Sequence, residues 1–273
     1  MQLNKMEFEN KVILVTGASS GIGKATALLF AERGARLALV GRDEAKLRSV
    51  AEECAKHQLQ HLHITADIST DEGCERVAKQ TLEHFGRLDV LVNCAGVAAI
   101  TSLETADMAS FDRVFGTVVR GAFNLTRLLA PALVAARGSI VNVSSIAATM
   151  VHVGSLPYGM AKAALDHFTR LIALELAPKG VRVNTVSPGI TNTPLLQRLT
   201  GHTDEEHAAF LKNSEARIPM RQTCEPADVA RVIAFLAGGD SRMVTGATVK
   251  VDGGLQLVGL GEMLKDQNEQ MRK

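Results

Sequence analysis

Short apolar runs alternate along the chain with longer segments in which apolar residues recur at helical spacing. The runs, several of them almost uninterrupted by polar residues, occupy residues 11–16, 36–40, 62–65, 89–93, 139–144, 181–186 and 248–251. Runs of this kind are typical of strands covered on both faces. The segments with helical spacing occupy residues 21–33, 43–57, 71–85, 110–136, 158–178 and 226–237. This alternation predicts an α/β fold, a doubly wound parallel sheet with about seven strands.

Such a Rossmann-type sheet binds ligands at the carboxyl ends of its strands. Two segments depart from the alternation. Residues 194–225 show no strand pattern and contain one short helical piece near 204–212; an insertion of this length beside a sheet usually serves as a lid or substrate loop. The tail at 260–273 is polar and charged, and we expect it to be frayed or used in subunit contacts. Because no linker divides the chain, residues 1–273 are predicted to form a single domain.

Composition excludes several classes of function. The chain has 30 Lys and Arg residues and 29 Asp and Glu residues, which gives a net charge of +1. It therefore lacks the excess of positive charge that is typical of proteins that bind nucleic acid or an anionic membrane. The four cysteines form no CxxC pair and have no histidine at metal spacing, so reduced thiols and no metal site are expected. The first ten residues lack the apolar stretch of a signal peptide, and no uninterrupted apolar run reaches the roughly 18 residues of a membrane span. We therefore predict a soluble, cytoplasmic protein.

A glycine-rich segment, TGASSGIG at 16–23, follows the first predicted strand and opens the first predicted helix. Its glycines allow a tight turn and let the backbone approach a pyrophosphate, which binds the N–H groups of the helix N-terminus. The position between strand and helix favours a dinucleotide site over an ordinary glycine-rich turn. The residues expected to contact the cofactor here are Gly17, Ser19, Ser20, Gly21, Ile22 and Gly23.

The Gly-xxx-Gly-x-Gly spacing and four later motifs, in the same order, resemble the short-chain dehydrogenase/reductase family. The motifs are Asn93-Cys94-Ala95-Gly96, Ser145 with Tyr158 and Lys162, Pro188-Gly189, and Val251-Asp252-Gly253-Gly254. The resemblance covers roughly residues 8 to 254. It implies hydride transfer between a nicotinamide dinucleotide and a small carbonyl or alcohol. Further cofactor contacts implied by it are Asp67 at the adenine, Ile68, Asn93, Ala95, Gly96, Pro188, Gly189, and Ile190 and Thr193 at the nicotinamide.

The end of the second predicted strand, at 39–43 (LVGRD), bears on cofactor choice. Gly41 stands where the family's NAD-specific acid would be, and Arg42 can bind the 2′-phosphate of NADP bidentately. The alternative is that Arg42 is solvated and Asp43 binds the ribose of NAD(H), although Asp43 is more simply an N-cap. Ser20 argues the other way, because many NADP-preferring relatives have a basic residue there. We predict NADP(H) in preference to NAD(H).

Tyr158 is the only tyrosine, and Lys162 lies one helical turn further along. Carbonyl reduction requires a proton donor, and a phenol with an ordinary pKa of about 10 is poorly matched to neutral pH. A neighbouring ammonium, together with oxidised nicotinamide, should lower that pKa. By resemblance, Ser145 holds the substrate oxygen and Lys162 also binds the nicotinamide ribose, whereas Ser144 is expected to point into local packing. Each residue alone has an ordinary structural alternative, but the family spacing favours the catalytic interpretation.

Val118 departs from the family pattern, in which an asparagine at this position holds a water that begins a proton relay. Its place in an apolar stripe with Val114 and Ala122 predicts a core role instead. Asn124 points about 120° away on a helix and cannot replace it. Either another route, through Thr117 or backbone carbonyls, supplies the proton, or the enzyme is slowed. The retained Ser145, Tyr158 and Lys162 favour activity.

The resulting prediction is an NADP(H)-dependent carbonyl reductase or alcohol dehydrogenase for small ketones, dicarbonyls or sugar-type carbonyls. One alternative is a 3-oxoacyl-thioester reductase; another is a catalytically weak, dinucleotide-binding regulatory protein. The segment 194–225 is expected to decide specificity, and the apolar candidates that face substrate are Ile146, Ala148, Val153 and Leu195. The resemblance also implies a homotetramer or homodimer packed through the helices at 110–136 and 158–178.

Overall fold

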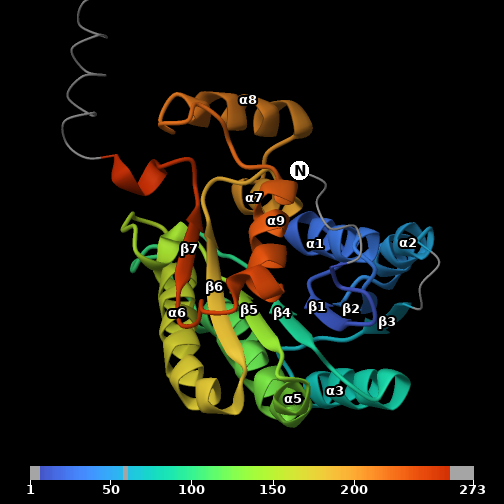
Figure 1. The fold of residues 1–273 in the computed structure, drawn as a ribbon. Helices are drawn as coiled ribbons and strands as arrows, with labels where there is room; N and C mark the ends of the chain where they lie inside the picture. Colours follow the sequence, from blue (N-terminus) through green and yellow to red (C-terminus); the bar gives the residue numbers. More distant parts are fainter. Residues whose placement is uncertain (1–6, 58–60, 259–273) are drawn as a thin grey trace, which may run out of the picture.

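Seven parallel strands form one sheet in the order β3-β2-β1-β4-β5-β6-β7 (Figure 1). The computed structural model describes residues 7–57 and 61–258, so the predicted tail at 260–273 lies outside the described residues. The strands are β1 (Val12–Thr16), β2 (Arg36–Gly41), β3 (His61–Thr65), β4 (Val90–Asn93), β5 (Ser139–Val143), β6 (Arg182–Pro188) and β7 (Thr248–Val251). The predicted doubly wound α/β fold is confirmed.

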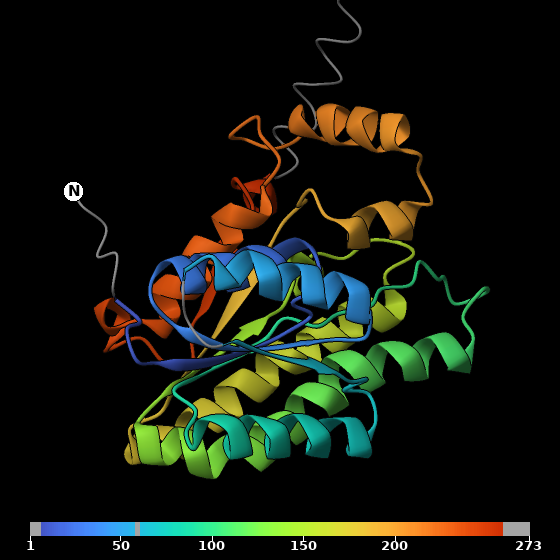
Figure 2. The same ribbon diagram turned by 90° about the vertical axis from the view of Figure 1, so that its right-hand side faces the viewer.

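Helices cover both faces of the sheet, as Figure 2 shows in side view. Those of the described chain are α1 (Gly21–Glu32), α2 (Glu44–Ala55), α3 (Asp71–Phe85), α4 (Met108–Phe115), α5 (Ala122–Ala136), α6 (Leu156–Leu176), α7 (Pro194–Thr200), α8 (Asp204–Glu215) and α9 (Pro226–Ala237). On one face α1, α2 and α9 pack on the sheet, and on the other α3, α5 and α6. Strand β1 is wholly buried because its side chains alternate between these two cores: Ile13 and Val15 enter one, Val12 and Leu14 the other.

Two helical features differ from the prediction. Helix α7 was missed, although Thr193 caps it and Pro194 occupies its first turn, both ordinary start signals. The predicted helix at 110–136 is interrupted by a π-helical turn, η1 (Gly116–Gly121), between α4 and α5. A π-helical turn absorbs one extra residue within a single turn, so it leaves no apolar period of its own in the sequence.

The continuous helical stretch Met108–Ala136 is long and apolar enough, by length and composition, to cross a membrane. Arg113, Arg120 and Arg127 interrupt it, so no uninterrupted apolar run marks it in the sequence. Its apolar side chains have partners inside the protein: Leu125, Leu129 and Leu133 are fully buried in the core beneath the sheet. A core helix meets the same criteria, and the burial accounts for the apolar composition.

A chain of buried polar side chains joins α6 to the sheet. Asn93 Nδ2 donates to Asn142 Oδ1 at 2.8 Å, and Asn142 Nδ2 donates to Thr169 Oγ1 on α6, also at 2.8 Å. Thr185 Oγ1 of β6 lies 2.8 Å from the same Thr169 oxygen, which in turn donates to Leu165 O at 3.0 Å. These bonds fix the height of α6 along β5 and β6, because buried donors left without acceptors are costly.

Replacing Thr169 with valine keeps the shape but removes the acceptor shared by Asn142 and Thr185. We expect the free energy of unfolding, measured by urea denaturation, to fall by about 2–4 kcal/mol, since each unpaired buried group costs about 1–3 kcal/mol. Thr81→Val is the matched control: Thr81 is equally buried, but its hydroxyl bonds only Val77 O of its own helix, at 2.7 Å. Equal losses in the two variants would contradict a special role for the polar chain.

Candidate active site

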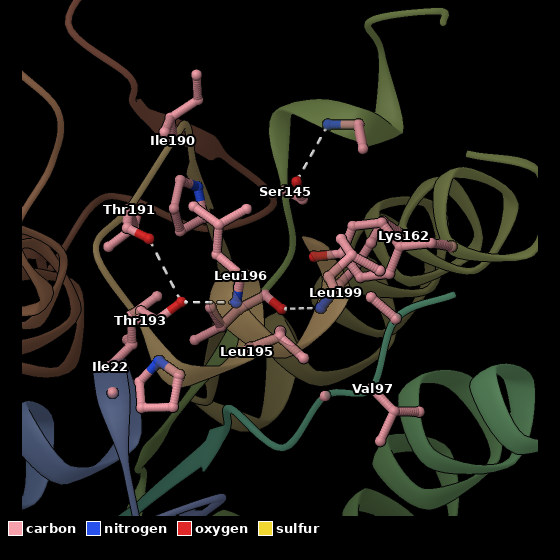
Figure 3. Close-up of a pocket in the computed structure, with 18 of the residues that line it drawn as sticks. Ile22, Val97, Ser145, Lys162, Ile190, Thr191, Thr193, Leu195, Leu196 and Leu199 are labelled. Atoms are coloured by element: carbon pink, nitrogen blue, oxygen red, sulfur yellow. Dashed lines mark hydrogen bonds between the residues drawn. The ribbon is translucent and has the colours of Figure 1, made fainter. Parts of the chain in front are cut away.

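A cavity of about 1930 Å³ opens at the carboxyl ends of the strands. Figure 3 shows Ser145 and Lys162 on one side of it and Ile190, Thr191 and Thr193 on the other. Predicted site residues that line this cavity are Gly17, Ser19, Ser20, Gly21, Ile22, Gly23, Arg42, Asp67, Ile68, Ala95, Gly96, Ser145, Tyr158, Lys162, Pro188, Gly189, Ile190 and Thr193. Of the predicted apolar substrate contacts, Ile146, Val153 and Leu195 line it.

Two predicted residues lie elsewhere. Asn93 does not line the cavity; its side chain is buried and belongs to the polar chain beneath it. Ala148 ends the short 3-10 turn Ile146–Ala148, and its neighbour Ala147 lines the cavity in its place. Along a strand one residue reverses the face, and along a 3-10 turn it rotates the side chain by about 120°, so neighbouring residues face different surroundings.

The glycine turn leaves a cradle that side chains would fill. Gly17 has a φ of +69°, and a Cβ there would lie 2.9 Å from Ala95 Cα; a Cβ on Gly23 would lie 2.2 Å from Gly17 O. Helix α1 begins at Gly21, and its N-cap, Ser20, makes no side-chain hydrogen bond to the first turn. The first N–H groups of α1 are therefore available to an anion. These features fit the pyrophosphate of a dinucleotide.

Thr16 is a site residue that the sequence analysis did not single out. Its Oγ1 accepts hydrogen bonds from the backbone N–H groups of Cys94 and Ala95, both at 3.0 Å. These two bonds hold the backbone that follows β4 beside the end of β1. They thereby position Ala95, whose backbone forms the wall of the cradle next to Gly17. A threonine at the end of a buried strand gives no local signal of such a contact.

The far end of the cavity, beyond β2 and β3, contains two cations and two carboxylates. Arg42 Nη1 lies 3.8 Å from Asp67 Oδ2. Asp43 caps α2, accepting from Lys46 N at 3.1 Å, and its other oxygen lies 3.2 Å from Lys46 Nζ. Asp43 is thus already paired as an N-cap, and Lys46, which was not predicted, is a second cation lining this end.

Asp67 also has the turn-forming role expected as its alternative. Its Oδ1 accepts from the backbone N–H and the hydroxyl of Ser69, at 2.9 and 2.8 Å. Burial opposes ionisation of Asp67, but these two bonds and Arg42 outweigh it, so the pKa of the carboxyl lies below its usual range. The group therefore faces this end of the cavity as an anion at neutral pH.

Lys162 and Tyr158 lie together on the first turns of α6. The Lys162 side chain is 4% exposed, and its Nζ donates to Val143 O at the end of β5, at 2.7 Å. The same Nζ lies 5.6 Å from the centroid of the Tyr158 ring. Burial lowers the pKa of Lys162 to about 8. The ammonium is therefore close to its titration point under physiological conditions.

The lowered pKa predicted for Tyr158, from Lys162 together with oxidised nicotinamide, is not found in this structure, where the pKa is raised. Burial raises the pKa of the phenol, and a hydrogen bond with Ser145 opposes this shift. The Lys162 ammonium lies over the ring and bonds the Val143 carbonyl rather than the phenol oxygen, so it does not outweigh burial. Tyr158 is therefore a neutral phenol at neutral pH.

The serines next to each other at the end of β5 have different surroundings. Ser145 lines the cavity, and its Oγ accepts from Ala147 N at 3.2 Å. Since a hydroxyl has one donor hydrogen besides its acceptor sites, Ser145 can still donate into the cavity. Ser144 is 3% exposed and donates to the Lys162 backbone carbonyl at 3.3 Å, within the packing between β5 and α6.

Residue 118 lies away from the cavity. Val118 is 2% exposed and packs in an apolar cluster with Val114, Ala122, Ala161 and Leu165, as its stripe predicts. Its neighbour Thr117 is the residue of the π-helical turn that lines the cavity. The Asn124 side chain donates from Nδ2 to Asp71 Oδ1 on α3 at 2.7 Å, and Asn124 does not line the cavity.

The hydroxyl of Thr193, expected at the nicotinamide, caps α7 in this structure. It accepts from Leu196 N and donates to Thr191 O, both at 3.3 Å (Figure 3). The methyl group of Thr193 packs against the glycine turn, since a Cβ on Gly21 would lie 3.3 Å from it. Thr193 therefore joins the candidate substrate segment to the cofactor cradle.

Comparison with known proteins identifies the class to which this arrangement belongs. A family model described as enoyl-(acyl carrier protein) reductase matches residues 17–256. A 3-oxoacyl-(acyl-carrier-protein) reductase of Thermotoga maritima is 36% identical over 251 residues, covering 92% of this chain and 99% of that protein. A glucose 1-dehydrogenase of Gluconobacter oxydans is 38% identical over 264 residues, covering 93% of this chain and 95% of that protein.

Solved structures agree with this comparison. L-sorbose reductase from Gluconobacter frateurii, complexed with NADPH and L-sorbose, matches with a TM-score of 0.87 at 29% identity, over 93% of this chain and 100% of that chain. This chain belongs to the short-chain dehydrogenase/reductase family of oxidoreductases.

Proposed function

We propose that this chain is an NADP(H)-dependent oxidoreductase that reduces a small ketone, dicarbonyl or sugar-type carbonyl, with Tyr158 as the proton donor. One observation supports this proposal most strongly. Ser145, Tyr158 and Lys162 line the same cavity as the glycine turn, so a nucleotide in the cradle and a carbonyl near the phenol would share one space.

When bound, the reduced nicotinamide supplies the hydride. Tyr158 Oη gives its proton to the substrate oxygen as negative charge develops there. Ser145 donates its remaining hydrogen to the same oxygen and so stabilises that charge. Lys162, as a cation beside the Tyr158 ring, stabilises the phenolate left behind.

The protonation state of Tyr158 favours the reductive direction. Reduction begins from a neutral phenol, whereas alcohol oxidation begins from a phenolate. Because burial raises the pKa of Tyr158, the neutral form is the resting form at neutral pH. Proton donation therefore needs no prior ionisation step.

The preference for NADP(H) rests on the charge at the adenosine end. Arg42 and Lys46 both line the cavity there, and Gly41 places no carboxylate beside them. Asp43, the residue that would favour NAD(H), is paired with Lys46 and the first turn of α2. A 2′-phosphate would meet two cations with complementary charge. The L-sorbose reductase structure, which matches this chain with a TM-score of 0.87, is a complex with NADPH.

Arg42→Ala is expected to raise the Kd for NADPH about 10- to 100-fold, because a hydrogen-bonded charge pair with the phosphate is lost. The Kd for NADH should change less than about threefold, since NADH has no 2′-phosphate. Nucleotide fluorescence titration measures both. Arg48→Ala is the matched control, because Arg48 lies nearby in the sequence on α2, pairs with Glu44 at 2.9 Å and does not line the cavity. Equal weakening of both nucleotides by Arg42→Ala would refute the phosphate role.

Tyr158→Phe should lower kcat for carbonyl reduction by about 10²–10⁴-fold while leaving the Kd for NADPH within about twofold, because only the proton donor is removed. Steady-state NADPH oxidation and fluorescence titration measure the two quantities. Activity of the variant equal to that of the parent chain would instead favour the alternative of a catalytically weak, dinucleotide-binding regulatory protein.

Carbonyl reduction should decline as the pH rises through about 8. Burial lowers the pKa of Lys162 to about 8, so the cation that stabilises the phenolate is present below this pH and lost above it. The pKa of Tyr158 is raised, so the phenol stays protonated through this range and does not produce the decline. A kcat/KM profile from about pH 6 to about pH 10 measures it. Lys162→Arg should abolish the decline, because a guanidinium stays charged; the same decline in that variant would rule out Lys162 as its source.

A 3-oxoacyl-thioester reductase is the second candidate. The Thermotoga maritima relative is named for that activity. The cavity of about 1930 Å³ also extends past the catalytic residues along α7 and α8, which provides room for a longer substrate.

We also propose a cytoplasmic homodimer or homotetramer. Apolar side chains project from α5 and α6 into solvent: Phe123 and Met160 are 51% exposed, Leu171 57% and Leu174 80%. Their common position on the two long helices supports subunit packing through this face, since contiguous exposed apolar patches mark interaction sites.

A further inference from the structure

The substrate half of the cavity has a charge that catalysis does not use. Three arginines line it from the segment between β6 and α9: Arg198 on α7, and Arg217 and Arg221 just after α8. Within residues 7–57 and 61–258, the guanidinium groups of Arg198 and Arg217 form no ion pair or hydrogen bond with another residue, whereas that of Arg221 donates to Ala216 O. The only carboxylates among the described lining residues, Asp43 and Asp67, lie at the adenosine end, beyond β2 and β3.

Arg217 is held in place by its neighbours. Ser214 and Ile218, on either side of it, are 8% and 1% exposed. Arg221, at the far side of the same turn, has a left-handed φ of +56° and donates from its guanidinium to Ala216 O, which closes the turn around residues 216–221. Non-glycine residues adopt this conformation only where surrounding contacts enforce it. The backbone that carries Arg217 is therefore fixed, and its side chain is exposed at the cavity.

Apolar side chains line the same part of the cavity as these cations. Leu195 and Leu199 of α7, Phe210 of α8 and Ile218 line it, and Ile146 and Leu257 line it as well. Ser145 and Tyr158 provide hydrogen-bonding groups in the same cavity. The cavity thus offers hydrogen-bonding, apolar and cationic groups to one ligand.

We propose, building on the function proposed above, that the natural substrate is an anionic carbonyl compound: a reacting carbonyl, an apolar segment and a terminal anion held by Arg198 and Arg217. Carboxylates and phosphates are the anions that arginine binds best, through paired N–H groups. Two sources share this chemistry, a free oxo carboxylic acid and the phosphates of a coenzyme A thioester.

Two substrate pairs test the proposal in the intact enzyme with NADPH. The first pair is 7-oxooctanoate and its methyl ester, and the second is acetoacetyl-coenzyme A and the neutral acetoacetyl-N-acetylcysteamine. The charged member of one pair should show a kcat/KM about tenfold or more above its neutral partner, mainly through KM, and that pair identifies the source. Equal values within both pairs would overturn the proposal. Reduction of the neutral members would still support the carbonyl reductase, whereas no reduction of any of the four compounds would count against the proposed function itself.

Substitution of Arg198 and Arg217 tests whether these two side chains cause the preference for the charged substrate. An exposed charge pair changes affinity by about two- to fivefold, so the double variant Arg198→Gln/Arg217→Gln should raise KM for the charged substrate about tenfold and leave the neutral one within about twofold. Raising the salt from about 0.05 M to about 0.5 M should mimic the double variant in the parent chain and have little effect in the variant. Arg231→Gln is the matched control, an exposed arginine on α9 that pairs with Asp228 away from the cavity. An unchanged KM for the charged substrate, or an equal rise in KM for NADPH, would refute the assignment.

Discussion

The burial of one ammonium group, that of Lys162, constrains the whole carboxyl end of the sheet. A buried cation is unfavourable unless acceptors replace water, and here the acceptor is the Val143 carbonyl at the end of β5. That bond requires α6 to lie at one height along the strand, which the hydrogen bonds of Thr169 to Asn142 and Thr185 establish about two helical turns further along α6. The fold and the site therefore depend on the same few polar contacts.

The same burial sets the protonation states of Tyr158 and Lys162. It lowers the pKa of Lys162 and raises that of Tyr158, because a poorly solvated environment disfavours charge on either group. The phenol is thereby kept as an acid, and the amine is kept near its titration point. Proton donation to a carbonyl uses this resting state directly, whereas alcohol oxidation must first ionise a group that burial holds neutral.

Local patterns in the sequence predicted the sheet, most helix positions and the glycine cradle. The turn at Gly17 and Gly23 was predictable because its requirement is steric. A side chain at either position would clash with neighbouring backbone atoms, so only glycine fits there. The π-helical turn and the pKa of Tyr158 were not predictable in this way. The pKa of Tyr158 depends on its burial and on where the Lys162 ammonium points, and spacing along a helix gives only proximity. The π-helical turn has no apolar period that would mark it in the sequence.

The two halves of the cavity recognise ligands by different means, and this explains why cofactor class is easier to infer than substrate. The cofactor half uses backbone N–H groups and the absence of side chains, which few sequences can provide. The substrate half uses side chains of α7, α8 and the following turn, such as Leu199 and Arg217, which can vary without disturbing the sheet. A 3-oxoacyl-(acyl-carrier-protein) reductase and a glucose 1-dehydrogenase are almost equally similar to this chain, at 36% and 38% identity. Overall similarity therefore supports a thioester and a sugar about equally, and the charge of the cavity wall is the more discriminating observation. Cations without a carboxylate partner in the described wall of the substrate half favour an anion, whatever the rest of the substrate is.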